Sequence, residues 1–384
     1  MKVLIAVLAD AIGATRLPRL FHDAGCRVTV YCPAHFAIRY SRYAHRHIPA
    51  PEDPEEFVAT LGRHFAAEGE CYQWAGAGEE TSLRAIMAYK GHENWASRIM
   101  PVSDNPDSLA LITSKVELLS HAESFGIRIP AQQRFDSIAA VEAAASRLTY
   151  PLVVKLPESM AASGVRFVGS REELCQQKWE DEAAQVPVII QDFVTGENGS
   201  TEVLFEHGRP VCWLSSFHHE FWPNFLAASC VRELVDLPEI EELLQKVGSM
   251  TGLHGLAGID WIRNPVNQML YFIELNPRPT PCYHLGPRVG VDFPRALREW
   301  VKGDPVNVQR PRAPKPRQAL VYQFPQYCYR AIDDRAFHLL VRVLPDVPRD
   351  DPNLVAALLR RVMTHNLPKS MRGFLRKVLR PPKS

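Results

Sequence analysis

The chain has 384 residues, of which 46% are hydrophobic, and it carries 44 Lys and Arg against 43 Asp and Glu. A chain of this length and composition can bury two or three cores of ordinary domain size, so we expect a soluble globular protein. The formal net charge of +1 excludes a global attraction to nucleic acid or to a membrane surface.

The eight cysteines are scattered, without a C-x-x-C pair or a Cys/His spacing suited to zinc. They are typical of reduced thiols, so we predict a cytoplasmic protein. The first residues, MKVLIAVLADAIGA, contain Asp10 within their apolar run, which favours an opening parallel strand over a signal peptide. Because no uninterrupted apolar run of about 18 residues occurs, no membrane partner is expected.

The N-terminal pattern predicts a βαβ unit. Residues 2–9 form an apolar strand, TRLPRLFHDAG follows with helical spacing, and CRVTVYCP is a second strand. A dinucleotide site would require G-x-G-x-x-G after the first strand, but LADAIGATRL contains only Gly13. We therefore interpret residues 1–105 as a Rossmann-like scaffold domain, which ends at the Pro, Asn and Asp cluster of PVSDNPDSLALI.

The pattern changes to α+β after this boundary. Predicted strands are YPLVVKLP, GVRFVG and VPVIIQDFV, and STEVLFEHGRPVCWLSSF predicts a hairpin that turns at His207 and Gly208. A helix over 237–251 precedes the strands LAGIDWI and MLYFIELN, which the turn RNPVNQ joins as an antiparallel pair. The predicted fold class is therefore α/β followed by α+β.

Three oxygen-bearing side chains gather on that last hairpin. Asp260 lies in its first strand, and Glu274 and Asn276 occupy alternate positions in its second strand. Buried carboxylates require a counter-charge, and two carboxylates with an amide oxygen suit Mg²⁺ better than zinc. Magnesium in turn indicates a phosphate-bearing substrate. The alternative is a surface hairpin whose polar side chains face water.

Residues 105–305 resemble the ATP-grasp superfamily in the motifs GIDWIRNPVNQMLYFIELNPR, SKVELLSHAESFGIRIPAQQ, YPLVVKLP and VIIQDFVTGEN. The resemblance implies a pre-ATP-grasp domain over 1–105 and a two-lobed ATP-grasp domain over 106–305, with its hinge near 191–197. Residues 306–384 are then a Pro-rich linker and a basic, mainly helical C-terminal extension. We interpret its basic face as solvated, so a nucleic-acid partner is not expected, and a homodimer is left open.

The resemblance assigns the metal and the catalytic cations. The implied metal ligands are Asp260, Glu274, which bridges two ions, and Asn276. Arg278 is implied beside the reacting phosphate. Members often carry an Arg two residues before the first acidic ligand, where this chain has Gly258. Phosphate stabilisation therefore rests on Arg278 and Arg232, the two predicted catalytic residues.

The resemblance also assigns the nucleotide site. The implied residues are Lys115, Val153, Lys155, Ser163, Gly164, Gln191, Phe193, Val194, Glu197 and Ile273. The two lysines are suited to phosphate oxygens, and the hinge backbone offers a donor and an acceptor to adenine. The Glu197 carboxylate would accept hydrogen bonds from the ribose hydroxyls, and Asn198 is the reserve residue for this role. The phosphate loop PESMAASGVRFV departs from the family because it has only one glycine, Gly164, although its small residues still permit close approach.

The substrate side of the site is less constrained by the motifs. Relatives frequently have an Arg where this chain has His218 and His219. The predicted substrate residues are His218, His219 and Arg288, and Trp222, Arg232 and Tyr283 are further candidates for the cleft.

The predicted function is ATP-dependent ligation of a small-molecule carboxylate and an amine through an acyl phosphate, with release of ADP and phosphate. The expected cofactors are ATP and two Mg²⁺ ions, with Mn²⁺ as an open alternative. Two other functions stay open: another ATP-grasp chemistry, such as carboxylation or carbamoyl-phosphate formation, and regulatory ATP binding without catalysis.

Overall fold

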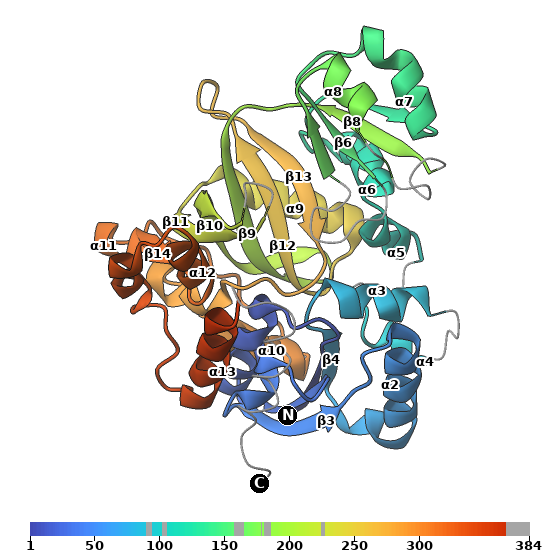
Figure 1. Ribbon diagram of the computed structural model, residues 1–384. Coiled ribbons are helices and arrows are strands. Elements are labelled where there is room, and N and C mark those ends of the chain that lie inside the picture. Colours follow the sequence, from blue (N-terminus) through green and yellow to red (C-terminus); the bar gives the residue numbers. More distant parts are fainter. Residues whose placement is uncertain are drawn as a thin grey trace.

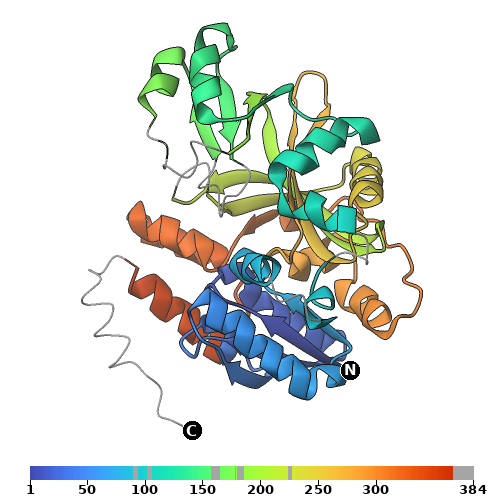
Figure 2. The same ribbon diagram turned by 90° about the vertical axis from the view of Figure 1, so that its right-hand side faces the viewer.

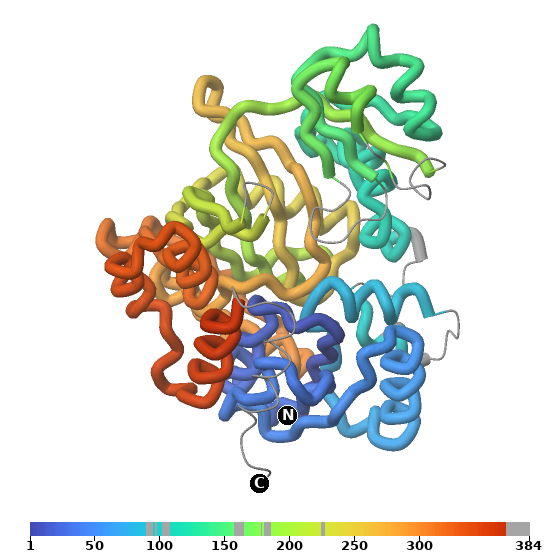
Figure 3. The backbone as a smooth tube through the Cα atoms, in the orientation of Figure 1, coloured from blue at the N-terminus to red at the C-terminus, as the bar shows by residue number. Residues whose placement is uncertain are grey.

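The computed structural model of the chain (Figure 1) describes residues 1–89, 94–101, 106–156, 165–177, 179, 186–223 and 227–365. In this part of the chain the strands form three sheets, and the predicted α/β and α+β classes are confirmed. A four-stranded sheet lies at the bottom of Figure 1, a six-stranded sheet in the centre and a second four-stranded sheet at the top. Figure 3 shows the same stacking as a continuous tube.

The N-terminal sheet is parallel and has the strand order β3-β2-β1-β4. Its strands are β1 (Lys2–Ala6), β2 (Arg27–Cys32), β3 (Ala44–Pro49) and β4 (Trp74–Ala77). Consecutive buried positions in β1 and β2 reflect the covering of both faces of a parallel sheet. The helices and 3₁₀ turns of this unit are η1 (Ile12–Arg16), α1 (Leu17–Asp23), η2 (Ala37–Tyr40), α2 (Pro54–Glu68), η3 (Gly69–Cys71), α3 (Glu80–Ala88) and α4 (Asn94–Ser97).

The six-stranded sheet is antiparallel and has the order β13-β12-β9-β10-β11-β14. Its strands are β9 (Glu197–Glu206), β10 (Arg209–Phe221), β11 (Ser229–Val235), β12 (Gly255–Arg263), β13 (Leu270–Asn276) and β14 (Leu320–Tyr322). The predicted β9–β10 turn is confirmed, and both His207 and Gly208 have positive φ, as a tight hairpin turn requires. The predicted pairing of β12 with β13 is also confirmed.

The third sheet is a smaller unit, with the order β5-β8-β6-β7. Its strands are β5 (Gln132–Phe135), β6 (Leu152–Lys155), β7 (Val165–Val168) and β8 (Val188–Asp192), and its helical segments are α7 (Ile138–Ala144), η5 (Ala145–Arg147) and α8 (Arg171–Gln176). The helical segments that flank the six-stranded sheet are α5 (Pro106–Thr113), α6 (Lys115–Ala122), η4 (Glu123–Phe125), α9 (Glu239–Thr251), η7 (Tyr283–Val289) and α10 (Phe293–Lys302). The last strand of the small unit, β8, ends at Asp192, so the predicted hinge near 191–197 leads from this unit into β9 of the six-stranded sheet.

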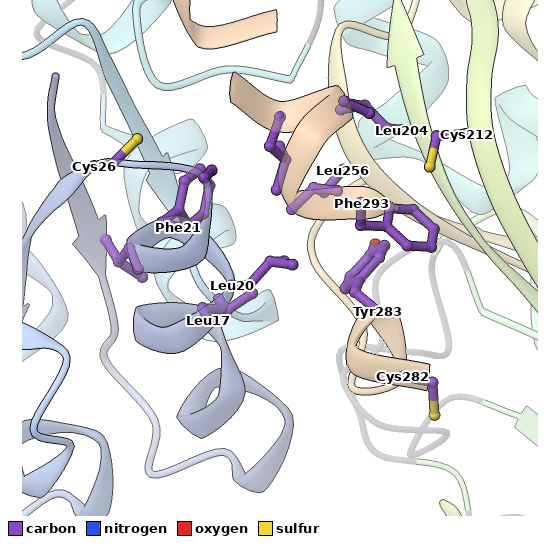
Figure 4. Packing of buried hydrophobic residues seen from close by; sticks show 14 of the residues in the cluster. Leu17, Leu20, Phe21, Cys26, Leu204, Cys212, Leu256, Cys282, Tyr283 and Phe293 are labelled. Carbon is purple, nitrogen blue, oxygen red and sulfur yellow. The ribbon is translucent and has the colours of Figure 1, made fainter. Parts of the chain in front are cut away.

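The N-terminal unit and the six-stranded sheet share one apolar core. Leu17 and Phe21 of α1 belong to the same cluster of buried side chains as Leu256 of β12 and Phe293 of α10 (Figure 4). These four side chains are at most 3% exposed. Burial of this apolar surface holds the two units in one arrangement, in which Glu80 of α3 contacts Arg278 just after β13.

The C-terminal segment is mainly helical and contacts the N-terminal unit. Its elements are α11 (Pro316–Ala319), β14, α12 (Gln326–Asp333), η8 (Phe337–Val343) and α13 (Pro352–Met363). Figure 2 shows α13 beside the N-terminal unit. Ser41 donates a hydrogen bond to Asp351 at 2.5 Å, and Arg361 pairs with Asp10 at 3.1 Å. Residues 366–384, which include most of the predicted basic extension, lie outside the described residues.

The domain boundaries at residues 105 and 305 stay predictions. The three-residue strand β14 lies beyond the second boundary and still pairs with β11 of the six-stranded sheet. Among the described residues, every helix is too short or too polar to cross a lipid bilayer.

Candidate functional site

The β12–β13 hairpin brings the three predicted metal ligands together. Asp260 lies directly opposite Glu274, and Asn276 lies opposite Gly258, so all three side chains project from the same face. Asn276 Nδ2 donates a hydrogen bond to Asp260 Oδ2 at 3.1 Å. A β-bulge follows at Asp260 and Trp261, where the register with β13 shifts. The polar residues at the end of β13 therefore form part of one cluster and do not simply face water.

The electrostatics of this hairpin favour a bound cation. Burial, followed by the neighbouring Glu274 carboxylate, raises the pKa of Asp260 to about 7, although Arg232 and Asn276 act in the opposite direction. A divalent cation would oppose both effects on the pKa of Asp260, because it stabilises the two ionised carboxylates together. No group of three or more His, Cys, Asp or Glu side chains is arranged as a metal site in the described ranges. The third ligand would be the amide oxygen of Asn276, which completes a donor set suited to Mg²⁺. In this structure that oxygen accepts a hydrogen bond from Arg278 Nη2 at 3.1 Å while Asn276 Nδ2 faces Asp260, so the amide group would turn over to bind a cation.

Two lysines from different elements converge on β13. Lys115, the first residue of α6, forms an ion pair with Glu274, with 2.8 Å between Nζ and Oε1. Lys155, at the end of β6, donates a hydrogen bond from Nζ to the main-chain oxygen of Ile273 at 3.0 Å. Burial lowers the pKa of Lys155 to about 8, against the effect of Glu274. A small cavity at this junction is lined by Lys115, Leu118, Leu119, Lys155, Val165, Ile273, Glu274 and Leu275.

The predicted hinge follows β8, directly beside β6. Gln191 is buried, lies opposite Val153 and donates a hydrogen bond to Gln132 at 3.1 Å. The Phe193 amide donates a hydrogen bond to the main-chain oxygen of Pro151 at 3.3 Å. The Phe193 amide is therefore already paired, which leaves its carbonyl and the backbone of Val194 for the predicted contacts with adenine. Val194 follows in the connection to β9.

The register of β9 separates the two candidates for the ribose. Ser200 lies opposite Asp260 of the β12–β13 hairpin, which we call the metal hairpin after its predicted ligands. Asn198 is two residues from Ser200, so it projects from the same face of the sheet as Asp260. Glu197 has the opposite parity and shares its face with Thr201, whose hydroxyl accepts a hydrogen bond from the Trp261 indole at 2.9 Å. Glu197 therefore projects from the face opposite Asp260, whereas the reserve residue Asn198 shares the face of Asp260. The two are adjacent in sequence, and only the strand register distinguishes them.

Arg232 lies on the same face, three strands from the metal hairpin, and is buried in a polar network. Its Nη1 donates to Ser200 at 2.6 Å, to Glu202 at 3.2 Å and to Ser216 at 3.3 Å. Burial raises the pKa of Glu202, although Arg232 opposes this effect. Sequence reasoning missed Ser200 and Glu202. Their signal was present, since the polar residues Asn198, Ser200 and Glu202 alternate along β9 as Glu274 and Asn276 alternate along β13.

The two neighbouring histidines have different surroundings. The His218 ring nitrogen Nε2 lies 3.0 Å from Ser200 Oγ, and burial, followed by Arg232, lowers its pKa well below the usual value. His219 instead pairs with Glu233 at 2.7 Å on the exposed surface. A register shift between β10 and β11 follows His218. The structure therefore brings His218 into the network with Ser200 and Arg232, and it corrects the prediction for His219.

Arg278 extends from the end of β13 toward the N-terminal unit. Its Nη2 donates to Asn276 at 3.1 Å and to Glu80 of α3 at 3.2 Å. Gly258, where ATP-grasp proteins often carry an Arg, lies under Thr280, because a Cβ there would be 2.5 Å from Thr280 Cγ2. An Arg at this position would displace Thr280, so Arg278 and Arg232 remain the candidate catalytic arginines.

Two groups of predicted residues lie outside this cluster. Arg288, in η7, donates from Nη1 to the main-chain oxygen of Gln318 at 3.3 Å, and no contact with the cluster is found for it among the described residues. The predicted substrate role of Arg288 is therefore not supported by its position. The predicted phosphate-loop residues Ser163 and Gly164 lie outside the described residues.

Comparison with known proteins identifies relatives of the part of the chain that carries this cluster. A family model described as an ATP-grasp domain matches residues 112–282. The chain is 25% identical over 177 residues to acetyl-CoA carboxylase of Schizosaccharomyces pombe and 25% identical over 216 residues to D-alanine–D-alanine ligase of Ectopseudomonas mendocina. These matches cover 43% and 54% of this chain but only 8% and 66% of the two relatives.

The fold is also similar to a solved structure. The biotin carboxylase domain of Hydrogenobacter thermophilus 2-oxoglutarate carboxylase matches with a TM-score of 0.62 and 15% sequence identity. The match covers 81% of this chain and 72% of that chain, and the solved domain is in complex with MgADP, ADP and bicarbonate. At this level of identity the similarity concerns the fold alone.

Proposed function

We propose that this chain, which belongs to the ATP-grasp superfamily through residues 112–282, is an ATP-dependent ligase that joins a carboxylate to an amine. The observation that carries the proposal is the convergence of Lys115 and Lys155 on the strand that holds Glu274. Two ammonium groups beside the carboxylates of Glu274 and Asp260 suit the binding of a nucleoside triphosphate together with its metal ion.

Each part of the cluster has a role in this proposal. Asp260, Glu274 and Asn276 would hold two magnesium ions, which would neutralise charge on the β- and γ-phosphates when bound. Lys115 and Lys155 would bind phosphate oxygens as point charges. Lys155 sits against the Ile273 carbonyl, so its ammonium is held at a fixed place on the wall of the site.

The reaction follows in two steps. A carboxylate oxygen of the first substrate attacks the γ-phosphorus of ATP, which forms an acyl phosphate and releases ADP. The amine nitrogen of the second substrate then attacks the acyl carbon, phosphate leaves with the electron pair of the broken C–O bond, and the amine loses one proton. Arg278 would stabilise the transferring phosphoryl group and the oxyanion of the second step. Arg232 and His218 would face the substrate from β11 and β10.

The relatives support amide ligation and also keep one alternative open. D-alanine–D-alanine ligase, matched over 54% of this chain, is by its name a ligase of two amino acids. Acetyl-CoA carboxylase and the bicarbonate-bound biotin carboxylase domain instead favour carboxylation as the second candidate. Both chemistries begin with phosphorylation of a carboxylate-type oxygen, so they share the phosphate and metal residues.

Product analysis distinguishes these reactions. The purified full chain is incubated with ATP, Mg²⁺ and a panel of amino acids and other carboxylates, each with and without an amine acceptor. We expect ADP and phosphate to appear only when a suitable carboxylate is present, with full turnover requiring the amine. Formation of AMP and pyrophosphate would contradict the acyl-phosphate route.

Two further outcomes select the alternatives. ADP release that requires bicarbonate in place of other carboxylates would identify a carboxylating enzyme. Calorimetric binding of ATP without turnover under any condition would identify a regulatory nucleotide site. The variant Glu274→Gln serves as the inactive control in each assay, because it loses the central charge and keeps the shape of the side chain.

A further inference from the structure

Helix α3 of the N-terminal unit begins beside the metal hairpin, and its first turn is fixed by Glu79. The Glu79 side chain caps this helix by accepting the amides of Thr81 and Ser82. The same carboxylate accepts the amides of Leu8 at 2.9 Å and Ala9 at 3.2 Å, in the loop after β1. Glu80, the next residue, therefore lies at a helix N-terminus that the hydrogen bonds of Glu79 connect to the loop after β1.

Glu80 contacts two arginines through different oxygens. Its Oε2 accepts hydrogen bonds from Arg278 Nε at 3.3 Å and from Arg278 Nη2 at 3.2 Å. Its Oε1 accepts a hydrogen bond from Arg84 Nε at 3.0 Å. Burial raises the pKa of Glu80, but Arg278 and Arg84 outweigh it, and the pKa lies below its usual value. The carboxylate is therefore ionised at neutral pH and pairs with both guanidinium groups.

The contact continues from Arg278 into the proposed metal site. Arg278 Nη2 also donates to Asn276 Oδ1 at 3.1 Å, and Asn276 Nδ2 donates to Asp260 at 3.1 Å. Glu80 and Asn276 thus hold one guanidinium group from two sides. The side chains of Arg278 and Glu80 are 22% and 23% exposed, so solvent reaches the pair.

We infer that Glu80 is a positioning residue for Arg278: it holds the guanidinium at the edge of the metal hairpin, in the orientation in which Arg278 meets the transferring phosphoryl group. This inference rests on the proposed function. Two N–H groups directed at one carboxylate fix the plane of a guanidinium as well as its place. Without Glu80, a long flexible side chain on the strand end would sample other rotamers, and a displacement of about 1 Å at a reacting group costs up to about a hundredfold in rate.

A double-mutant cycle on kcat tests the inference. The variants are Glu80→Gln, Arg278→Ala and the double variant, measured with the best carboxylate and amine found for the wild type. We expect Glu80→Gln to lower kcat about tenfold and to change KM for ATP by less than about twofold, because positioning acts in the transition state. Arg278→Ala should lower kcat by about a hundredfold, and the double variant should be no slower than Arg278→Ala alone.

Other outcomes overturn the inference. If the losses in the double variant multiply, Glu80 acts independently of Arg278 and does not position it. If Glu80→Gln leaves kcat unchanged, the ion pair has no part in the reaction. Partial recovery of kcat in Glu80→Asp, which restores the charge at a shorter reach, should accompany a positioning role.

A matched control addresses general effects of breaking an ion pair in the N-terminal unit. Glu68→Gln breaks the pair of Glu68 with Arg46, away from the hairpin, and should leave kcat unchanged. The melting temperature of Glu68→Gln should stay near the wild-type value, since its ion pair is exposed, and thermal unfolding of the other variants shows whether they are folded at the assay temperature. If the wild type turns over ATP and the cycle is multiplicative, only this inference fails. If the wild type has no turnover with any substrate, the proposed function fails and this inference falls with it.

Discussion

Lys155 Nζ donates a hydrogen bond to the main-chain oxygen of Ile273 at 3.0 Å, across 118 residues of sequence. The contact joins β6 of the small sheet to β13 of the six-stranded sheet, next to the residue that Lys115 pairs with. Among the described residues, the Ile273 carbonyl is the hydrogen-bond acceptor found for Lys155, and the proposed function assigns the other donors of its ammonium group to phosphate oxygens. The same contact and the nearby Glu274 carboxylate, which opposes the effect of burial on the pKa of Lys155, both stabilise the buried ammonium group.

Replacing Lys155 tests the nucleotide site directly. Lys155→Met keeps the apolar stem and removes the buried charge, so we expect the affinity for MgATP to fall by about ten- to a hundredfold, the range of one charge-assisted hydrogen bond. Calorimetric titration with a non-hydrolysable ATP analogue measures this affinity without turnover. The control Lys246→Met removes a cation that pairs with Glu242 on α9 and should bind the analogue like the wild type. Equal affinity in Lys155→Met would place the nucleotide elsewhere.

Glu274 is the centre of the proposed metal site. Glu274→Gln removes one negative charge between Lys115 and Asp260, so we expect kcat to fall by at least about a hundredfold and the affinity for Mg²⁺ to decrease. The free energy of unfolding should change by less than about 1 kcal/mol, because the pair with Lys115 is partly exposed. Steady-state kinetics over a magnesium titration measure both effects. Glu241→Gln, which breaks an exposed pair with Arg310, is the control and should be fully active.

The register of β9 makes opposite predictions for two adjacent residues. Asn198→Ala should weaken ATP binding severalfold, because Asn198 projects from the face that carries Asp260 and can reach the ribose. Glu197→Ala should leave the affinity unchanged, because this side chain projects from the other face. Parallel ATP titrations of the two variants decide between them. A loss confined to Glu197→Ala would restore the assignment made from sequence spacing.

Gly258 determines how Thr280 packs over the hairpin. Gly258→Ala places a Cβ 2.5 Å from Thr280 Cγ2, so we expect a loss of about 1–3 kcal/mol in the free energy of unfolding from overpacking. Thr280→Ser removes this methyl group, and the double variant should recover part of the loss. Urea denaturation of the three variants measures the free energies. Additive losses in the double variant would show that the close approach of Thr280 is not the cause.

The His207–His254 pair makes stability depend on pH. The rings stack with their centroids 4.0 Å apart, and the His207 amide donates to His254 Nδ1 at 3.2 Å. Burial, followed by His207, lowers the pKa of His254 from 6.5 to about 4. The unfolded state therefore binds the extra proton in this window, and the free energy of unfolding should fall as the pH drops from 6.5 to about 4.

Urea denaturation at several pH values measures this dependence. Because His254 is partly exposed, we expect its contribution to be about 1 kcal/mol across the window. His254→Phe should remove that part of the slope. Replacement of the exposed His35 by Phe should keep the wild-type slope, and an unchanged slope in His254→Phe would show that His254 does not couple folding to pH.

Local patterns were sufficient for the hairpins and for the shared face of the predicted metal ligands. Alternation is a property of neighbouring residues, so the strand pattern alone puts Glu274 and Asn276 on one face. The turn length between the strands then puts Asp260 opposite them. The same reasoning locates the His207–Gly208 turn, because tight turns depend on a few adjacent residues. It failed for β14, since a strand of three residues is specified by its partner β11 and not by its own pattern.

Tertiary structure decided the choices that sequence spacing left open or assigned wrongly. The register of β9 against β12 placed Asn198, and not Glu197, on the face of Asp260, and the packing of β10 against its neighbours gave His218 and His219 the different partners Ser200 and Glu233. Glu80 meets Arg278 across 198 residues of sequence. Such contacts depend on how α3 and the six-stranded sheet pack around their shared core. A linear pattern records the chemistry of each residue and the face it occupies, whereas its partners on other elements are set only when the units fold against one another.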